Sequence, residues 1–174
     1  MIFFTADTHF GHSNILSYCK RPFQTIEEHD EVLVQNWNNI VKKKDIVFHL
    51  GDVGFGNNLQ HTIHRLNGKI HLIIGNHDYR FLSRIRSRFT SIDETKTVTI
   101  QENGKTYVIF LSHFPHRSWD RAFYGTWHLF GHVHGRLPHL GYSFDVGVDC
   151  WNFAPVSLEQ VVNKMKGIEI VGVD

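Results

Sequence analysis

The sequence has only two cysteines, Cys19 and Cys150, which stand far apart and form no Cys-x-x-Cys pair. This pattern favours free thiols in a reducing compartment over a disulfide framework. Charge of one sign is also lacking: the formal net charge is +1 and the pI about 7.9, so no overall field favours nucleic acid or an anionic membrane. No apolar run approaches the roughly 18 residues of a membrane span, and residues 1–12 lack the basic region of a signal peptide. The sequence therefore predicts a cytoplasmic protein.

A chain of 174 residues, 41% of them hydrophobic, is long enough to bury a core without disulfides. It contains no repeat, linker or low-complexity segment, and we expect a single domain over residues 1–174. Histidine is abundant, with fourteen residues. Because histidine is a frequent metal ligand, the positions of these residues matter more than their number.

Short apolar runs rich in Ile, Val and Phe recur along the chain, and several lack clean alternation, which is typical of strands buried on both faces. They cover residues 2–6, 46–51, 70–75, 97–100, 107–112, 127–131 and 144–148. Asn103-Gly104 predicts a hairpin turn between the fourth and fifth runs.

Helical periodicity separates the early runs. Thr25 and Glu28 form a capping-box pattern ahead of a helix that extends to Val41. Shorter helices are predicted near residues 59–66, 81–85 and 157–165. The sequence thus favours a layered α/β domain with a mixed sheet region and helices outside it.

Polar residues follow five of the apolar runs directly. They are Asp7 and His9, Asp52, Asn76 with His77 and Asp78, His113, and His132 with His134. Open α/β sheets bind ligands beyond the carboxyl ends of their strands, so parallel neighbouring strands would bring these groups together. An antiparallel hairpin could still deliver His113 to the same edge.

Seven of these residues offer two carboxylates, four imidazoles and one amide, too many for one tetrahedral zinc ion. They fit two adjacent divalent ions with one carboxylate bridging. Oxygen and nitrogen donors without thiolate suit Mn, Fe, Zn, Ni or Co, and we favour Mn. Two metal ions about 3.5–4 Å apart form a known clamp for in-line displacement at phosphorus.

Five motifs in this order resemble the calcineurin-like metallophosphoesterases, and in particular the small bacterial and phage-type members. They are Asp7-x-His9, Gly51-Asp52, Gly75-Asn-His-Asp78, a lone His113 after a strand, and Gly131-His-x-His134. The resemblance implies a four-layer α/β/β/α sandwich, with two mixed β-sheets flanked by helices.

The resemblance also implies roles for the residues of these motifs. Asp7, His9 and His134 would hold one ion, Asn76, His113 and His132 the other, and Asp52 would bridge the two. A metal-bridging hydroxide would attack phosphorus, and His77 would act as the general acid that protonates the leaving oxygen.

Three residues outside the motifs are candidate substrate contacts. Arg117 could hold a phosphate with its bidentate fork, or be an ordinary surface arginine. His12 and Asn14 follow the first motif, and Asn14 could instead cap a short helix. Arg21 is expected to be a solvated charge, and Asp78 to cap the helix that follows it.

The loop GDVGFGNN lacks the Asp-Arg-Gly sequence of the phosphoprotein phosphatases. DTHFG matches the Asp-x-His-x-Gly pattern of the nuclease branch, but those enzymes usually carry a separate DNA-gripping domain, for which this chain has no room. We therefore expect a phosphodiesterase acting on a small phosphodiester or nucleotide substrate, with no membrane partner and no stable nucleic-acid binding. A phosphomonoesterase or phosphoprotein phosphatase, a nuclease and a non-catalytic scaffold of the same fold remain the alternatives.

Overall fold

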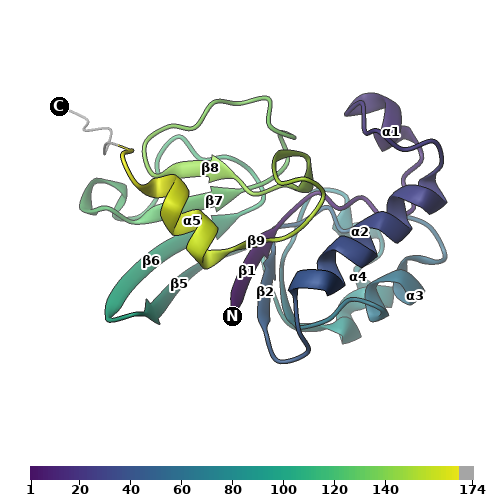
Figure 1. Ribbon diagram of the computed structural model, residues 1–174, viewed down its shortest axis with the longest axis horizontal. Coiled ribbons are helices and arrows are strands. Elements are labelled where there is room, and N and C mark those ends of the chain that lie inside the picture. Colours follow the sequence, from purple (N-terminus) through teal and green to yellow (C-terminus); the bar gives the residue numbers. More distant parts are fainter. Residues whose placement is uncertain (169–174) are drawn as a thin grey trace.

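The computed structural model describes residues 1–168, whose strands form two mixed sheets (Figure 1). The first has five strands in the order β4-β3-β2-β1-β9: Phe89–Asp93, Lys69–Ile73, Ile46–His49, Ile2–Thr5 and Val156–Ser157. The second has four strands in the order β5-β6-β7-β8: Thr95–Glu102, Lys105–Ser112, Trp127–Phe130 and Ser143–Asp145. Strands β4 and β9 lie outside the apolar runs of the sequence.

Strand direction brings the polar strand ends to one edge. Strands β1 to β4 are parallel to one another, and only β9 runs against its neighbour. In the second sheet β6, β7 and β8 are parallel, while β5 forms the antiparallel hairpin arm. The second arm of the hairpin therefore delivers His113 at the same end as the strands beside it, as predicted.

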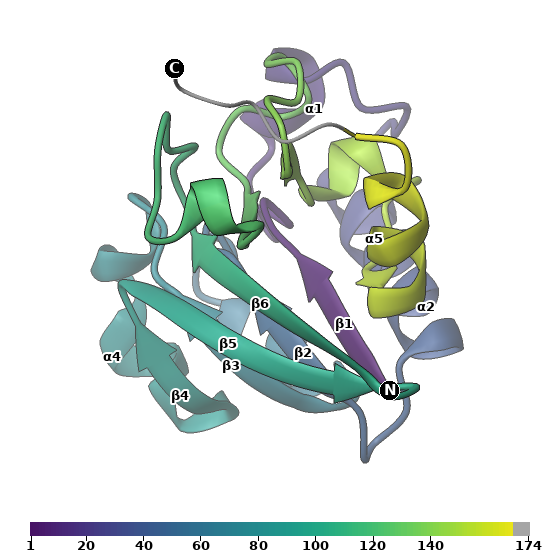
Figure 2. The same cartoon turned by 90° about the vertical axis from the view of Figure 1, so that its left-hand side faces the viewer.

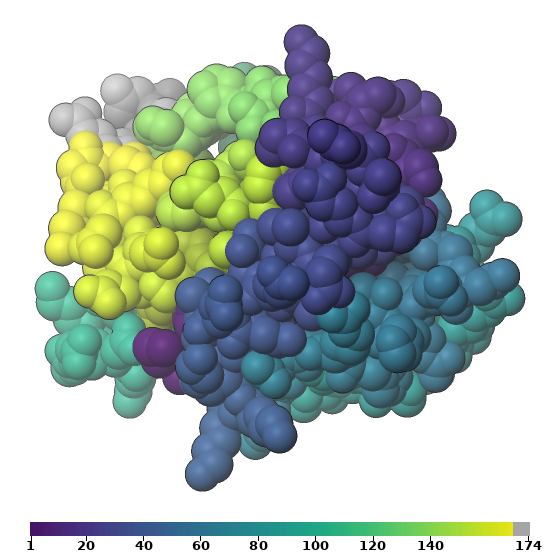
Figure 3. All heavy atoms as spheres, turned by 45° about the vertical axis from the view of Figure 1, so that its right-hand side comes forward, coloured from purple at the N-terminus to yellow at the C-terminus, as the bar shows by residue number. Residues whose placement is uncertain are grey.

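Five α-helices are described: α1 at Asn14–Tyr18, α2 at Ile26–Ile40, α3 at Leu59–His64, α4 at Leu82–Ile85 and α5 at Leu158–Met165. The side chain of Thr25 accepts a hydrogen bond from the Glu28 N–H and caps α2 as the sequence predicts. Ser157 and Gln160 form a complete capping box on α5. Figure 3 shows α2 (blue) crossing one face of the molecule between α5 (yellow) and the segments that carry α3 and α4.

Strand β1 is buried on both faces, and its alternating side chains enter two different cores. Phe3 packs with Trp37 of α2 and with residues of α3 and α4. Phe4 points the other way and packs with Leu111 of β6 and Val161 of α5. Figure 2 shows β5 and β6 lying across the face of the first sheet. The expected α/β sandwich with two mixed sheets and flanking helices is therefore confirmed.

The two sheets meet where their strands end. Ala6, just after β1, forms an isolated parallel bridge with Gly147, just after β8. This junction fixes the first predicted motif against the end of the second sheet. No helix within residues 1–168 is long and apolar enough to span a membrane.

Candidate metal centre

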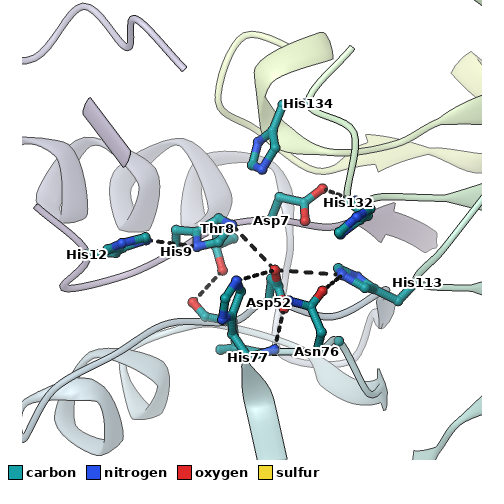
Figure 4. Close-up of polar contacts among 12 residues, drawn as sticks. Asp7, Thr8, His9, His12, Asp52, Asn76, His77, His113, His132 and His134 are labelled. Carbon is teal, nitrogen blue, oxygen red and sulfur yellow. Dashed lines mark hydrogen bonds and ion pairs between the residues drawn. The ribbon is translucent and has the colours of Figure 1, made fainter. Parts of the chain in front are cut away.

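The seven predicted ligands come together where the parallel strands of both sheets end (Figure 4). They form two groups, in each of which the ligand atoms lie within 4.8 Å of one another: Asp7 with His9 and His134, and Asp52 with His113 and His132. Asn76 lies beside the second group, with Oδ1 3.0 Å from His113 Nε2. Each group draws residues from loops that follow strands of both sheets.

Asp52 lies between the two groups. Its Oδ2 atom is 3.6 Å from His9 Nε2 in the first group and 3.6 Å from His113 Nε2 in the second. Its Oδ1 atom accepts a hydrogen bond of 3.0 Å from the His77 backbone N–H, which fixes the orientation of the carboxylate. One oxygen that faces both groups is the arrangement that a bridging ligand requires.

His113 and Asn76 make a contact that calls for a cation. His113 Nδ1 lies 2.7 Å from the Leu50 carbonyl oxygen, to which it must donate its proton. The other nitrogen of the neutral ring, Nε2, is then an acceptor, yet it faces the acceptor Oδ1 of Asn76 at 3.0 Å. A positive ion between them would turn this repulsive pair into two ligands. The Nδ1 bond to a backbone carbonyl is also the usual outer contact of a metal-binding histidine.

Buried polar atoms without partners mark the first group. Within residues 1–168, Asp7 Oδ1 and His9 Nε2 are among the few buried side-chain atoms that lack a hydrogen bond. Asp7 is fully buried and His9 is 2% exposed, so water does not readily satisfy them. Such atoms are costly unless something binds them, and a divalent ion would bind both.

The backbone of the site is strained. The φ angles are 57° at Asp7, 50° at His9, 56° at Asp52, 70° at His132 and 50° at His134, all in the left-handed region. That region is uncommon for residues with a Cβ atom, and such strain tends to accumulate at functional sites. Five of the seven predicted ligands adopt it here.

Close approach of the loops needs glycine at two positions. A Cβ atom on Gly51 would lie 2.5 Å from the Gly75 nitrogen, and one on Gly75 would lie 2.4 Å from Asp52 Oδ1. Both distances are too short for any side chain. The Gly-Asp and Gly-Asn-His-Asp motifs therefore need glycine at these two positions, because the two loops are in direct contact there.

Burial sets the ionisation of the first group. It raises the pKa of Asp7 well above the usual range, and the carboxylates of Asp145 and Asp52 raise it further against the opposing charge of His134. Burial also lowers the pKa of His9, helped by the nearby charge of Arg21. A neutral imidazole is ready to bind a metal, and a divalent ion would offset the repulsion among the carboxylates.

His134 is held by two further charged side chains, those of Asp149 and Arg21. Its Nδ1 atom lies 2.7 Å from Asp149 Oδ2, which leaves Nε2 as the nitrogen available to an ion. Burial alone would lower the pKa of His134, but hydrogen bonds to Asp149 and Cys19 raise it to about 10, so an ion bound at Nε2 would displace a proton. Arg21 grips Asp149 with two bonds, Nε to Oδ1 at 2.9 Å and Nη2 to Oδ2 at 2.7 Å.

The expectation that Arg21 is a solvated charge is wrong. Arg21 is 4% exposed, and its guanidinium also donates to the backbone carbonyls of Asp7 and Thr8 at 2.7 and 3.1 Å. Arg21 therefore links the backbone of the first motif to Asp149, the residue that supports His134 of the last motif. The topology brings Asp149 to Arg21 from far along the chain, which local sequence cannot reveal.

Asp78 does not cap the following helix, where His77 occupies the cap position of a 3₁₀ turn at Asp78–Arg80. Its carboxylate accepts three backbone hydrogen bonds, from Gly75 at 2.7 Å and from Asp52 and Val53 at 2.8 Å each. These bonds join the loop after β2 to the loop after β3. Asp78 therefore positions the candidate bridge Asp52.

His77 lies at the rim, with a side chain 47% exposed and Nε2 3.9 Å from Asp52 Oδ2 (Figure 4). Its ring packs against Phe55, with ring centroids 5.2 Å apart. The side chain thus reaches both solvent and the centre, as a proton donor to a bound substrate would need to.

The three candidate substrate contacts occupy different surroundings. His12 lies at the site, with Nδ1 3.2 Å from His9 Nδ1 and its ring 4.3 Å from that of Phe55. Asn14 is exposed and is the first residue of α1, whose cap position belongs to Ser13. Arg117 is exposed and lines a separate pocket with Phe130 and Leu137, none of whose lining residues within the described chain is a candidate ligand.

No established family profile matches the chain. It is 36% identical over 181 residues to the uncharacterized protein MJ1445 of Methanocaldococcus jannaschii, covering 98% of this chain and 94% of that protein. It is 30% identical over 198 residues to the gene 66 protein of Mycobacterium phage D29, covering 97% of both chains. The chain belongs to the family of these proteins.

Solved structures agree on the fold. The crystal structure of AQ665, a protein of unknown function from Aquifex aeolicus, matches 95% of this chain with a TM-score of 0.70 at 23% identity. That likeness establishes the fold alone. An archaeal phosphodiesterase matches 84% of the chain with a TM-score of 0.44, too low to carry an argument about function. A function can therefore be inferred only from the residues of the site itself.

Sequence reasoning missed Asp145 and Asp149 as well as Arg21. Asp145 accepts hydrogen bonds from the Gly135 and Gly147 N–H groups at 2.8 and 2.6 Å, which holds the loop of His134. Both aspartates stand in or directly after the apolar run 144–148. The rule that located the ligands, polar residues at strand ends, would have found them too.

Proposed function

We propose that this protein is a divalent-metal-dependent phosphoesterase that hydrolyses phosphodiesters. The observation that carries the proposal is the position of Asp52 Oδ2, 3.6 Å from imidazole nitrogens of both ligand groups. Asp7, His9 and His134 would hold one ion, Asn76, His113 and His132 would hold a second, and Asp52 would contribute to both. Oxygen and nitrogen donors without thiolate suit Mn, Fe, Zn, Ni and Co, of which Mn is our first candidate.

When bound, such ions supply Lewis acidity toward phosphate oxygens and a strong oxygen nucleophile at neutral pH. The residues of the chain position the groups that would bind these ions. Asp78 fixes the backbone of Asp52, and the His77 N–H holds the Asp52 carboxylate in one orientation. Arg21 and Asp149 hold His134. This rigidity keeps the donors in position without reorganisation during the reaction.

His77 is the proposed general acid. Hydrolysis of a diester forms a bond from phosphorus to a water oxygen and breaks the bond to the leaving alcohol, whose oxygen needs a proton. The exposed side of the His77 ring donates that proton, and the ring is steadied by its contact with Phe55. His12, next to His9, is the nearest further group that could contact substrate.

Metal-stripped protein supplied with Mn, Ni, Zn or Mg singly provides the test. Bis(p-nitrophenyl) phosphate reports diesterase activity and p-nitrophenyl phosphate monoesterase activity, while elemental analysis gives the metal content. The proposal expects about two ions per chain and faster hydrolysis of the diester. Faster hydrolysis of the monoester would favour a phosphomonoesterase. Two bound ions without hydrolysis of either would favour a binding scaffold.

The proposed substrate is a small phosphodiester or nucleotide that approaches from solution, with no membrane partner and no stable complex with nucleic acid. The near-neutral charge of the chain supports this, because a nucleic-acid partner generally needs a basic surface. Retention of labelled duplex DNA by the protein at physiological salt would contradict it.

A further inference from the structure

A pocket of about 350 Å³ opens beside the second ligand group. Asn76 and His113 line it, so it is continuous with the candidate metal centre. It lies at the connection between the sheets, where β4 ends at Asp93 and β5 begins at Thr95. Its volume suits one small organic group attached to a phosphate at the centre.

Two exposed aromatic side chains line this pocket. Tyr79 is 58% exposed and Phe114 is 48% exposed, so both rings can be reached from solution. The Phe114 ring meets those of His113 and His132 edge to face, with centroids 5.0 and 4.6 Å apart. Its position is therefore tied to the ligands, and its surface is available for stacking by a planar group.

Glu94 is the one carboxylate among the described residues that line the pocket, where it stands beside the polar side chains of Thr95, Ser112 and His116. The Tyr79 hydroxyl donates to Glu94 Oε1 at 3.3 Å, which leaves acceptor positions free on the exposed carboxylate. Within the described chain, no lysine or arginine is among the residues that line the pocket. It therefore disfavours a second phosphate and favours an uncharged group that carries N–H donors.

We propose that this pocket binds the nucleobase of a nucleotide phosphodiester, an inference that rests on the proposed phosphodiesterase function. The base stacks on Tyr79 and Phe114, and its N–H edge donates to Glu94. Guanine fits best, because two adjacent donors, N1–H and the amino group, match the two oxygens of one carboxylate. Uracil offers no pair of adjacent donors and fits less well.

Binding to the metal-free protein tests the pocket independently of catalysis. In EDTA, calorimetric titration should give at least about 10-fold tighter binding of guanosine 5′-monophosphate than of ribose 5-phosphate, with uridine 5′-monophosphate between them. Tyr79→Ala and Glu94→Gln should each weaken guanosine 5′-monophosphate binding about 10-fold. The matched controls are Tyr124→Ala, at a tyrosine 84% exposed elsewhere, and Glu159→Gln on α5, both of which should bind as the wild type does.

Hydrolysis separates the two proposals. The guanosine 5′-phosphate ester of p-nitrophenol and methyl p-nitrophenyl phosphate share a leaving group and differ only in the retained group. With Mn added, kcat/KM should favour the guanosine ester, and Tyr79→Ala should reduce this preference about 10-fold. Equal values for both esters, together with equal binding of the two monophosphates and ribose 5-phosphate, would overturn the pocket but not the phosphodiesterase. Tight guanosine 5′-monophosphate binding without hydrolysis of either ester would support the pocket and overturn the phosphodiesterase.

Discussion

The backbone N–H of His132 donates a hydrogen bond to Asp7 Oδ2 at 2.8 Å, so the last sequence motif is bonded directly to the first. The bond occupies one oxygen of the Asp7 carboxylate and leaves Oδ1 facing the site without a partner among the described residues. One contact thus both joins the two sheets and directs a ligand atom.

Replacing Asp52 should damage the centre more than replacing a ligand of a single group. Asp52→Asn removes the charge that faces both groups, whereas His9→Ala and Asn76→Ala each remove one donor from one group. We expect Asp52→Asn to retain the least metal and the lowest diesterase rate of the three. Elemental analysis and hydrolysis of bis(p-nitrophenyl) phosphate provide the measurement. Equal metal content and rates in all three variants would rule out a bridging role.

Asp149→Asn should weaken metal binding without touching a proposed ligand. The amide can no longer fix the His134 tautomer as the carboxylate does, and Arg21 loses its ionic partner. Loss of such an outer contact typically costs about 10–100-fold in metal affinity. Calorimetric titration with Mn measures it, and Asp120→Asn at an exposed position serves as the control. Unchanged affinity in Asp149→Asn would show that His134 does not depend on this bond.

His77→Ala should slow reactions according to the leaving group. An alkoxide needs a proton in the transition state, so alkyl diesters should lose the about 10²–10⁴-fold that general-acid catalysis typically contributes. p-Nitrophenyl diesters have a stable leaving group and should lose much less. Both rates are measured on metal-replete protein, with elemental analysis to confirm that the ions remain. Equal losses on the two substrates would exclude the acid role.

His128 should make the protein less stable in mild acid. It is fully buried between Ser112 and Ser143, and burial, with a smaller contribution from His116, lowers its pKa from 6.5 to about 3. The unfolded chain therefore binds a proton below pH about 6.5 that the folded chain excludes, and stability is lost as pH falls through that window. Between pH 7 and 5 this linkage amounts to about 2 kcal/mol of unfolding free energy.

The comparison of metal-free wild type with His128→Gln isolates this effect. Histidines other than the neighbouring His116 should titrate alike in both proteins, so the wild type should lose about 2 kcal/mol more between pH 7 and 5 in urea unfolding. The variant can be less stable at pH 7 without affecting the test, because only the pH dependence is compared. Parallel pH profiles would mean that His128 is protonated in the folded state.

Much of the fold could be predicted because buried strands and capped helices carry local signals. The apolar runs that contain Phe4 and Phe48 predicted strands buried on both faces, and Thr25 predicted the start of α2. Strand β4 was missed because its side chains are only partly buried and its sequence, FTSID, is mixed in polarity. Strand β9 has two residues, too few for a periodic pattern.

The candidate ligands could be predicted because each directly follows a strand, where chain direction alone decides the edge at which it lies. The contacts that the supporting residues make could not. Arg21 bonds to Asp149 across 128 positions of sequence, and Asp78 reaches the backbone of Asp52 across 26. The first pairing forms when the ends of the two sheets meet and the second when β2 and β3 pair, and a single sequence contains no local trace of either.

The division of each ligand group between the two sheets has a mechanical consequence. A bound ion would clamp the halves of the sandwich at the edge where their strands end, in the manner of a cross-link that chelators can remove. The ion would then act as a ligand of the folded state, and the melting temperature would rise with the concentration of free metal. The ion would thus add to the contacts that already join the ends of the sheets, such as the bridge between Ala6 and Gly147 and the bond from His132 to Asp7.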